Sequence, residues 1–162
     1  MRLAILSFIS LALFLLDMTL IPFFSAWGAY GSLLFTFGSI FSVQGDFDDA
    51  FTMALLTGFL QDIFFPYAFG MNMLINLVIF LGLSKIGTTL KEGRHSAEVL
   101  FTTGGALLKS LLMFSLLTLF GFGANSSSIP VAGIHTLIFA LLMHGSIVSL
   151  RRVPYMKKEW KF

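Results

Sequence analysis

Six apolar runs separated by short polar breaks occupy almost the whole chain. They cover residues 3–20, 31–43, 50–65, 70–86, 97–122 and 131–150. Because a membrane-spanning helix needs about 20 predominantly apolar residues, these runs predict an all-α integral membrane protein, a compact bundle of six transmembrane helices. The second run is short for a full crossing, so it is either tilted or begins earlier. We expect residues 1–150 to form a single six-span transmembrane domain and residues 151–162 a short basic cytoplasmic tail.

The scarcity of charge excludes most other classes of protein. Only 11% of the 162 residues are charged and 57% are hydrophobic, whereas about 25% of residues are charged in an ordinary soluble domain. A soluble domain of this size cannot bury so much apolar surface, and 20 phenylalanines argue against disorder. The chain has no cysteine, which excludes disulfides, thiolate metal sites and cysteine nucleophiles.

The distribution of positive charge predicts the orientation in the membrane. With six spans and both termini in the cytoplasm, nine of the ten lysines and arginines fall on the inner side and none in the outer loops. Because cytoplasmic loops carry the excess of Lys and Arg, this segregation favours an even number of spans in the cytoplasmic membrane. The basic tail either anchors the inner end or contacts anionic lipid or a cytoplasmic partner. The nine inner residues are Arg2, Lys85, Lys91, Arg94, Arg151, Arg152, Lys157, Lys158 and Lys161.

Three ionisable residues, Asp17, Asp62 and Lys109, lie inside the apolar runs. Counted at 1.5 Å per residue, they are about 18–21 Å from the inner ends of their helices and share one layer. We expect Lys109 to contact Asp62 or Asp17, because an ion pair offsets part of the desolvation cost. The layer either holds the bundle together, forms a ligand or partner site, or relays protons. Asn72 and Asn76 either bond helices together or line a polar pocket.

A stripe of small residues ends at one of these carboxylates. Residues four apart lie on one face of a helix, and small side chains at this spacing let another helix approach closely. The stripe therefore serves either packing inside the bundle or an interface with a partner. It consists of Ala50, Ala54, Gly58 and Asp62.

No enzymatic motif is found along the chain. There is no phosphate-binding Gly-Lys-Ser/Thr loop, no GxGxxG and no nucleophile elbow. The histidines, His95, His135 and His144, are too dispersed in the sequence for a metal site. We therefore expect a protein without catalysis of its own, without a cofactor or metal, and, given the shortness of the basic tail, without nucleic acid as a partner.

Two short motifs resemble the family of the rod shape-determining protein MreD. The family has G-x-x-x-D at the end of one helix and G-x-N-x-L at the start of the next, and this chain has GFLQD at 58–62 and GMNML at 70–74. Gly58, Asp62, Gly70 and Asn72 occupy the matching positions. The chain length and the layout of the apolar runs also fit, whereas the acidic segment 46–49 departs from the family.

This resemblance implies a component of the cell-wall elongation machinery in the bacterial cytoplasmic membrane. Members of the family act in cell shape determination and in the regulation of peptidoglycan synthesis. They bind MreC, a single-span protein with a large extracytoplasmic domain, and they act with MreB, RodA and a class B penicillin-binding protein. The family is not known for catalysis. Its fold is similar to the S components of energy-coupling-factor transporters.

That similarity supplies an alternative, a vitamin-binding S component with a ligand pocket near the outer face. An S component also needs a small-residue surface on its first span, but the small stripe of this chain lies on the third run. We therefore favour a membrane scaffold in which the stripe and its neighbours shape a groove or pocket. The transmembrane helix of a bitopic partner, or a peripheral loop, would dock against the bundle. The candidate residues of this intramembrane polar or partner-binding site are Asp17, Ala50, Ala54, Gly58, Asp62, Gly70, Asn72 and Lys109.

Overall fold

The computed structural model describes residues 1–90 and 95–154, and within these ranges the chain is helical and contains no strand. The all-helical prediction is thereby confirmed. The elements, in chain order, are α1 (Arg2–Thr19), the 3-10 helix η1 (Ile21–Phe24), α2 (Leu33–Val43), α3 (Phe47–Ile63), α4 (Met71–Gly87), α5 (His95–Leu119) and α6 (Ser128–Arg152).

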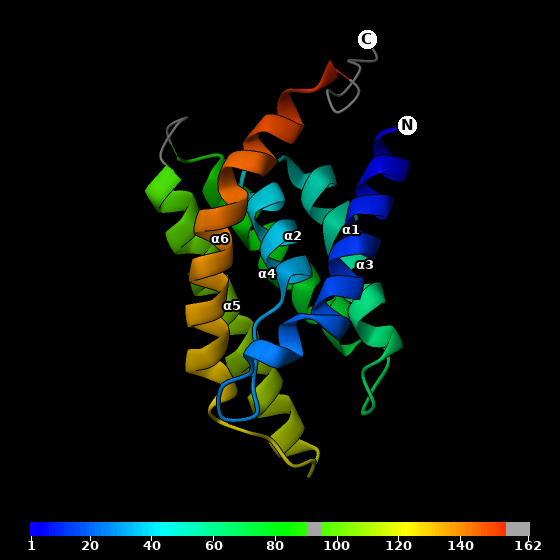
Figure 1. Ribbon diagram of the computed structural model, residues 1–162, viewed down its shortest axis with the longest axis vertical. Coiled ribbons are helices and arrows are strands. Elements are labelled where there is room, and N and C mark those ends of the chain that lie inside the picture. Colours follow the sequence, from blue (N-terminus) through cyan, green and yellow to red (C-terminus); the bar gives the residue numbers. More distant parts are fainter. Residues whose placement is uncertain (91–94, 155–162) are drawn as a thin grey trace.

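Successive helices run in opposite directions along the long axis of the molecule (Figure 1). The start of α1 and the end of α6 therefore lie at the same end, together with the connection from α2 to α3. We call this the charged end, because it holds the start of α1 with Arg2 and the last turns of α4 and α6, with Lys85, Arg151 and Arg152. The opposite end is formed by the segments 20–32, 64–70 and 120–127. We call it the uncharged end, since these segments contain no Asp, Glu, Lys or Arg.

Three of the helices, α1, α5 and α6, are long and apolar enough to cross a membrane. This supports a membrane protein at that coarser level. The helices α3 and α4 have 17 residues each, and α2 has 11. A crossing by each of the six helices therefore stays a prediction.

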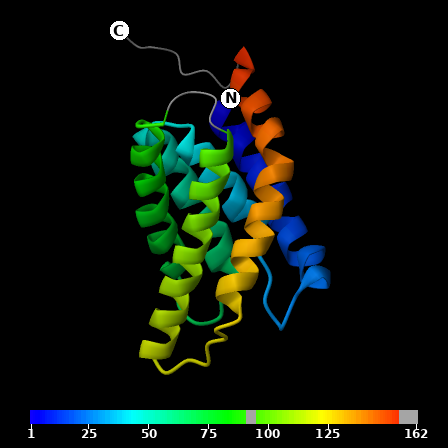
Figure 2. The same ribbon diagram turned by 90° about the vertical axis from the view of Figure 1, so that its left-hand side faces the viewer.

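The short second helix lies at the centre of the bundle. Every residue from Leu34 to Val43 is buried, and α2 packs against all five of the other α-helices. At 1.5 Å per residue its 11 residues span about 16 Å, roughly half of a hydrocarbon core. In Figure 2, α5 and α6 stand side by side in front of it. The other helices therefore cover this short helix along its length.

The small-residue stripe of α3 is used inside the bundle. Ala50, Ala54, Gly58 and Asp62 are all buried. A Cβ atom added at Gly58 would overlap the backbone of Met73 in α4, so the glycine permits the close approach of α3 and α4. The burial of the stripe and the contact of Gly58 with α4 support the interpretation as packing inside the bundle. A role of the stripe in binding a partner stays a prediction.

A buried carboxylate ties the charged end together. Asp49 of α3 pairs with Arg2 of α1, and its other oxygen accepts a hydrogen bond from Arg151 of α6 at 3.0 Å. Arg151 also donates to the carbonyl of Phe41, at 2.8 Å, in the last turn of α2. The acidic segment 46–49 thus neutralises arginines from two other helices.

The same contacts correct the predicted domain boundary. We expected the basic tail to begin at residue 151, but α6 continues through Arg152. Arg151 is part of the bundle because Asp49 and the end of α2 hold it in place. The remainder of the predicted tail, residues 155–162, lies outside the described residues, as do Lys91 and Arg94.

Candidate functional site

Asp17 lies in the last turn of α1 and caps the start of a different helix. Its carboxylate accepts hydrogen bonds from the Ser32 hydroxyl at 2.6 Å and from the backbone N–H groups of Leu33 and Leu34 at 2.7 and 3.1 Å. The first N–H groups of any helix lack partners within it, and at a buried helix start the protein has to supply acceptors for them. Asp17, which is 5% exposed, therefore satisfies the buried beginning of α2.

Asp62 does the same for α4. Its oxygens accept from the backbone N–H of Asn72 at 2.8 Å, from that of Met73 at 3.0 Å and from the Asn72 amide at 3.1 Å. The residue before the helix, Gly70, has no side chain to act as a cap and has a φ of 95°, which glycine adopts without strain. The two motifs at 58–62 and 70–74 are therefore parts of one helical hairpin that Asp62 closes.

Lys109 of α5 binds amide oxygens and not a carboxylate. Its ammonium donates to Gln61 Oε1 at 2.6 Å and to Asn76 Oδ1 at 2.8 Å, and it lies 4.7 Å from the centre of the Phe35 ring. No ion pair among the described residues involves it. The expected contact of Lys109 with an aspartate is therefore wrong. Both carboxylates are held by helix starts and reach the ammonium only through longer-range Coulomb attraction.

Amide side chains extend this contact into a network across four helices. Asn76 donates its amide N–H to Thr57 Oγ1 and to Gln61 Oε1, both at 3.1 Å. Gln61 in turn donates to the Ser32 hydroxyl at 3.1 Å. Since Ser32 also donates to Asp17, the network joins α2, α3, α4 and α5 to the end of α1. Gln61 and Ser32 were not among the predicted site residues, although Gln61 stands out as a polar residue within an apolar run.

A pocket of about 400 Å³ adjoins this network near the uncharged end. Its volume is within the usual range of small-molecule sites. Asp17, Asn72 and Lys109 line it, whereas Gly70, Asp62 and the rest of the stripe do not. Its polar lining also includes residues that sequence reasoning missed, namely Tyr30, Ser32, Gln61, Ser110, Ser128 and Thr136.

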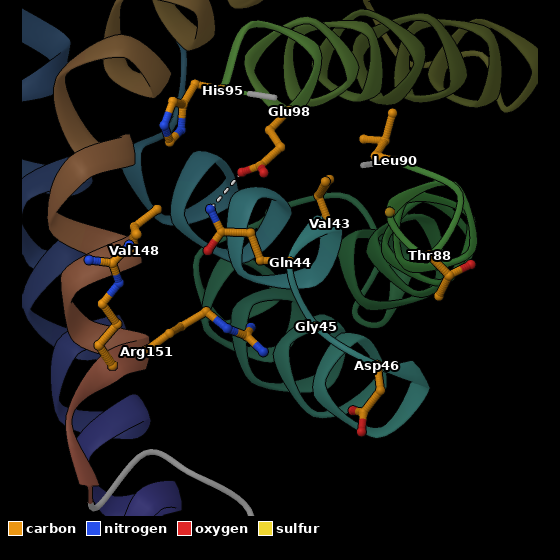
Figure 3. Close-up of a pocket in the computed structure, with 12 residues that line it drawn as sticks. Val43, Gln44, Gly45, Asp46, Thr88, Leu90, His95, Glu98, Val148 and Arg151 are labelled. Carbon is orange, nitrogen blue, oxygen red and sulfur yellow. Dashed lines mark hydrogen bonds between the residues drawn. The ribbon is translucent and has the colours of Figure 1, made fainter. Parts of the chain in front are cut away.

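A second pocket, of about 620 Å³, opens at the charged end (Figure 3). Glu98 accepts a hydrogen bond from Gln44 at 2.6 Å, drawn as the dashed line in Figure 3, and lies 2.8 Å from His144 Nε2. The rings of His95 and His144 meet edge to face, with centroids 4.6 Å apart. These two histidines, which we expected to be dispersed, are neighbours. Among residues 1–90 and 95–154, however, no group of His, Cys, Asp and Glu has the arrangement of a metal site.

The third histidine, His135, lies at the other end of the bundle. Its Nδ1 accepts the backbone N–H of Gly31 at 2.9 Å and so fixes the segment that leads into α2. It has a structural role that is independent of the two histidines at the charged end.

Comparison with known proteins gives no assignment. No family model, no curated protein and no solved structure matches this chain. The class that the fold and the pockets define is a helical bundle with membrane-length apolar helices and a polar pocket near its uncharged end.

Proposed function

We propose that this protein is a non-catalytic scaffold of the bacterial cell-wall elongation machinery, similar to the MreD family. In this role it binds an MreC-like bitopic protein and thereby contributes to cell shape determination and to the regulation of peptidoglycan synthesis. The observation that carries the proposal is the α3–α4 hairpin. Gly58, Asp62, Gly70 and Asn72, which carry the resemblance, act together there in one structural unit.

The proposal includes six membrane spans with the charged end in the cytoplasm. The helices α3 and α4, with 17 residues each, reach about 26 Å, close to the hydrocarbon thickness. The central α2 is the sixth span. It does not need to reach both membrane surfaces, because side chains of neighbouring helices supply hydrogen-bond partners for its two ends. The concentration of lysine and arginine at the charged end supports this orientation.

The surface proposed for the bitopic partner is the aromatic part of the uncharged end. Phe23, Phe24 and Trp27, which follow α1, are exposed there, and so is Phe64 after α3. Since these segments carry no charge, contacts with the extracytoplasmic part of the partner would be aromatic and backbone contacts. Large aromatic side chains are the usual anchors of protein interfaces.

The other expected partners belong to the opposite side. A filament protein such as MreB and anionic lipid would meet the charged end, whereas RodA and a class B penicillin-binding protein would join through the membrane. The proposal needs no cofactor, metal or nucleic acid.

Purification of the tagged protein from its native membrane in mild detergent, followed by mass spectrometry, tests the proposal. We expect a single-span protein with an extracytoplasmic domain and wall-synthesis enzymes. The double variant Phe23→Ser/Trp27→Ser should lose the single-span protein while still accumulating in the membrane. Phe120→Ser, an exposed aromatic position at the same end, is the matched control and should retain it.

The opposite result identifies the alternative. If paired ATPases and a small transmembrane coupling subunit are recovered instead, the protein is assigned to the S components of energy-coupling-factor transporters. In that case the scaffold proposal is abandoned.

A further inference from the structure

The pocket near the uncharged end combines one unpaired cation with apolar walls. We propose that it binds an amphipathic monoanion, whose anionic group is held by Lys109 and whose apolar body lies among the surrounding aromatic and methionine side chains. This inference concerns a ligand site and does not rest on the scaffold function proposed above.

The first argument is the balance of charge around the pocket. Asp17 and Asp62 each accept three hydrogen bonds, and of these six, five come from the start of the helix that each one caps. The start of a helix carries a partial positive charge of about half a unit, so each carboxylate is partly balanced where it lies. Neither carboxylate forms an ion pair with Lys109, so no acidic side chain among the described residues is in direct contact with the ammonium.

The second argument is the coordination of Lys109 itself. An ammonium group has three N–H donors, and two of them have acceptors among the described residues, Gln61 and Asn76. Both acceptors are neutral amides. A buried cation is costly unless a counter-charge accompanies it. Because Lys109 lines the pocket, an anionic group placed there would supply both the third acceptor and a counter-charge in direct contact with the ammonium.

The third argument is the composition of the walls. Apolar side chains from α1, α2, α5 and the loop after α3 line the pocket, together with the hydroxyl groups of Tyr30 and Ser110. Such walls cover an apolar body, while these two hydroxyls can donate hydrogen bonds to an anion. The apolar residues are Phe14, Met18, Phe35, Phe64, Phe65 and Met113.

The test uses three probes that share one apolar body and differ in charge. They are 3-phenylpropionate, the neutral 3-phenylpropionamide and the cationic 3-phenylpropylamine, titrated by calorimetry into the full-length protein in phosphatidylcholine nanodiscs. We expect the anion to bind saturably and about tenfold or more tightly than the amide, a factor that corresponds to about 1.4 kcal/mol. Equal binding of anion and amide, a preference for the amine, or no saturable binding would each overturn the proposal.

Variants of the protein distinguish the contribution of the Lys109 charge to ligand binding from the contribution of the pocket volume. Lys109→Gln should remove the preference for the anion over the amide. Ala132→Leu fills the pocket without touching the hydrogen bonds of Lys109, and it should weaken both ligands about tenfold or more. Lys85→Gln, at an exposed lysine of the charged end, is the matched control and should change nothing. If Lys109→Gln does not fold, Ala132→Leu still decides: unchanged binding in that variant would place the anion outside this pocket.

A further arm distinguishes two sources of the anion, a lipid headgroup and a soluble acid. Phosphatidylglycerol is added to the nanodiscs, and the titration with 3-phenylpropionate is repeated. The neutral amide is titrated alongside, because the surface charge of the lipid repels the anion alone. Weaker binding of both ligands shows that an anionic lipid occupies the pocket, and unchanged binding of the amide assigns the pocket to a soluble acid.

Discussion

At Asp62 a buried carboxylate finds its partners in the backbone of the next helix and not in a cation. Asp17 follows the same rule at α2. In both cases the acid lies at the end of one helix and caps the start of another, where the N–H groups have no other acceptor. The residue types and their depth in the sequence identified both positions as special. Every residue except proline has a backbone N–H group, however, so the sequence does not show which of them will lie beside a carboxylate. We therefore expected an ion pair with Lys109, and this expectation was wrong.

A charge reversal tests this distinction at the residue scale. We expect Lys109→Asp to destabilise the protein, and Asp62→Lys to do so by leaving α4 uncapped. The double variant should not recover stability, because a lysine cannot accept the hydrogen bonds of Asn72 and Met73. Thermal unfolding in detergent, followed by circular dichroism, measures the three variants. Recovery in the double variant would restore the ion-pair interpretation.

Among the elements, α2 depends most on its neighbours. Asp17 satisfies its first turn, and Arg151 binds the Phe41 carbonyl in its last turn. The Ser84 hydroxyl also donates to the Gly45 carbonyl at 3.0 Å just beyond its end. An 11-residue apolar helix is therefore stable at the centre of the bundle although it is too short to reach both membrane surfaces.

Removal of the Asp17 cap should be costly. Asp17→Ala leaves the N–H groups of Leu33, which is half-buried, and Leu34, which is buried, without their acceptor. Leaving one buried donor unsatisfied costs about 1–3 kcal/mol. We expect the thermal midpoint to fall by about 2–4 °C per kcal/mol. Thr19→Ala, two residues away, removes only an exposed hydroxyl bonded to its own helix and should stay within about 0.5 kcal/mol. Equal midpoints for the two variants would refute the capping role.

Two glycines distinguish the inside of the bundle from its surface. Gly58→Leu should prevent accumulation of folded protein, because even a Cβ overlaps the backbone of Met73. Nothing lies within 4 Å of a Cβ at Gly104 of α5. Gly104→Ala should therefore be neutral or stabilise the protein by up to about 1 kcal/mol, since alanine favours helix. Membrane yield and thermal midpoint measure both variants, and normal yield of Gly58→Leu would show that α3 and α4 are less tightly packed.

The boundaries of the elements followed closely from the sequence, since proline, glycine and polar residues interrupt each apolar run. The most informative difference between a predicted and an observed boundary is at the start of α3. We expected it to begin at Ala50, but it begins at Phe47, because Asp46 accepts the backbone N–H of Asp49 at 3.1 Å and caps the helix. Acidic residues in the first turn also stabilise the helix, because they interact favourably with the positive end of its dipole. Segment 46–49 is polar enough to suggest a loop, but its capping aspartate makes it the start of a helix.

For the whole molecule, the separation into a charged and an uncharged end was predictable from the lysines and arginines alone. The central position of α2 was not, because helices buried by protein and helices covered by lipid have equally apolar sequences. The two pockets were likewise beyond prediction, since each is lined from several helices that are distant in the chain.

The proposed orientation can be checked directly because the chain has no cysteine. Single cysteines at Thr88 and Ser126, exposed positions at the charged and uncharged ends, should react with a membrane-impermeant maleimide from opposite sides. We expect labelling at position 126 in intact cells, and at position 88 only after the membrane is opened. Labelling of both from the same side would contradict the six-span arrangement.

The placement of Arg151 has a consequence for how the chain is made. The second helix is synthesised early, but the side chain that completes its last turn belongs to the final helix. Until α6 has been synthesised as far as this arginine, α2 has neither its carbonyl partner nor the cover of α6. We therefore expect the centre of the bundle to close only after α6 has joined it.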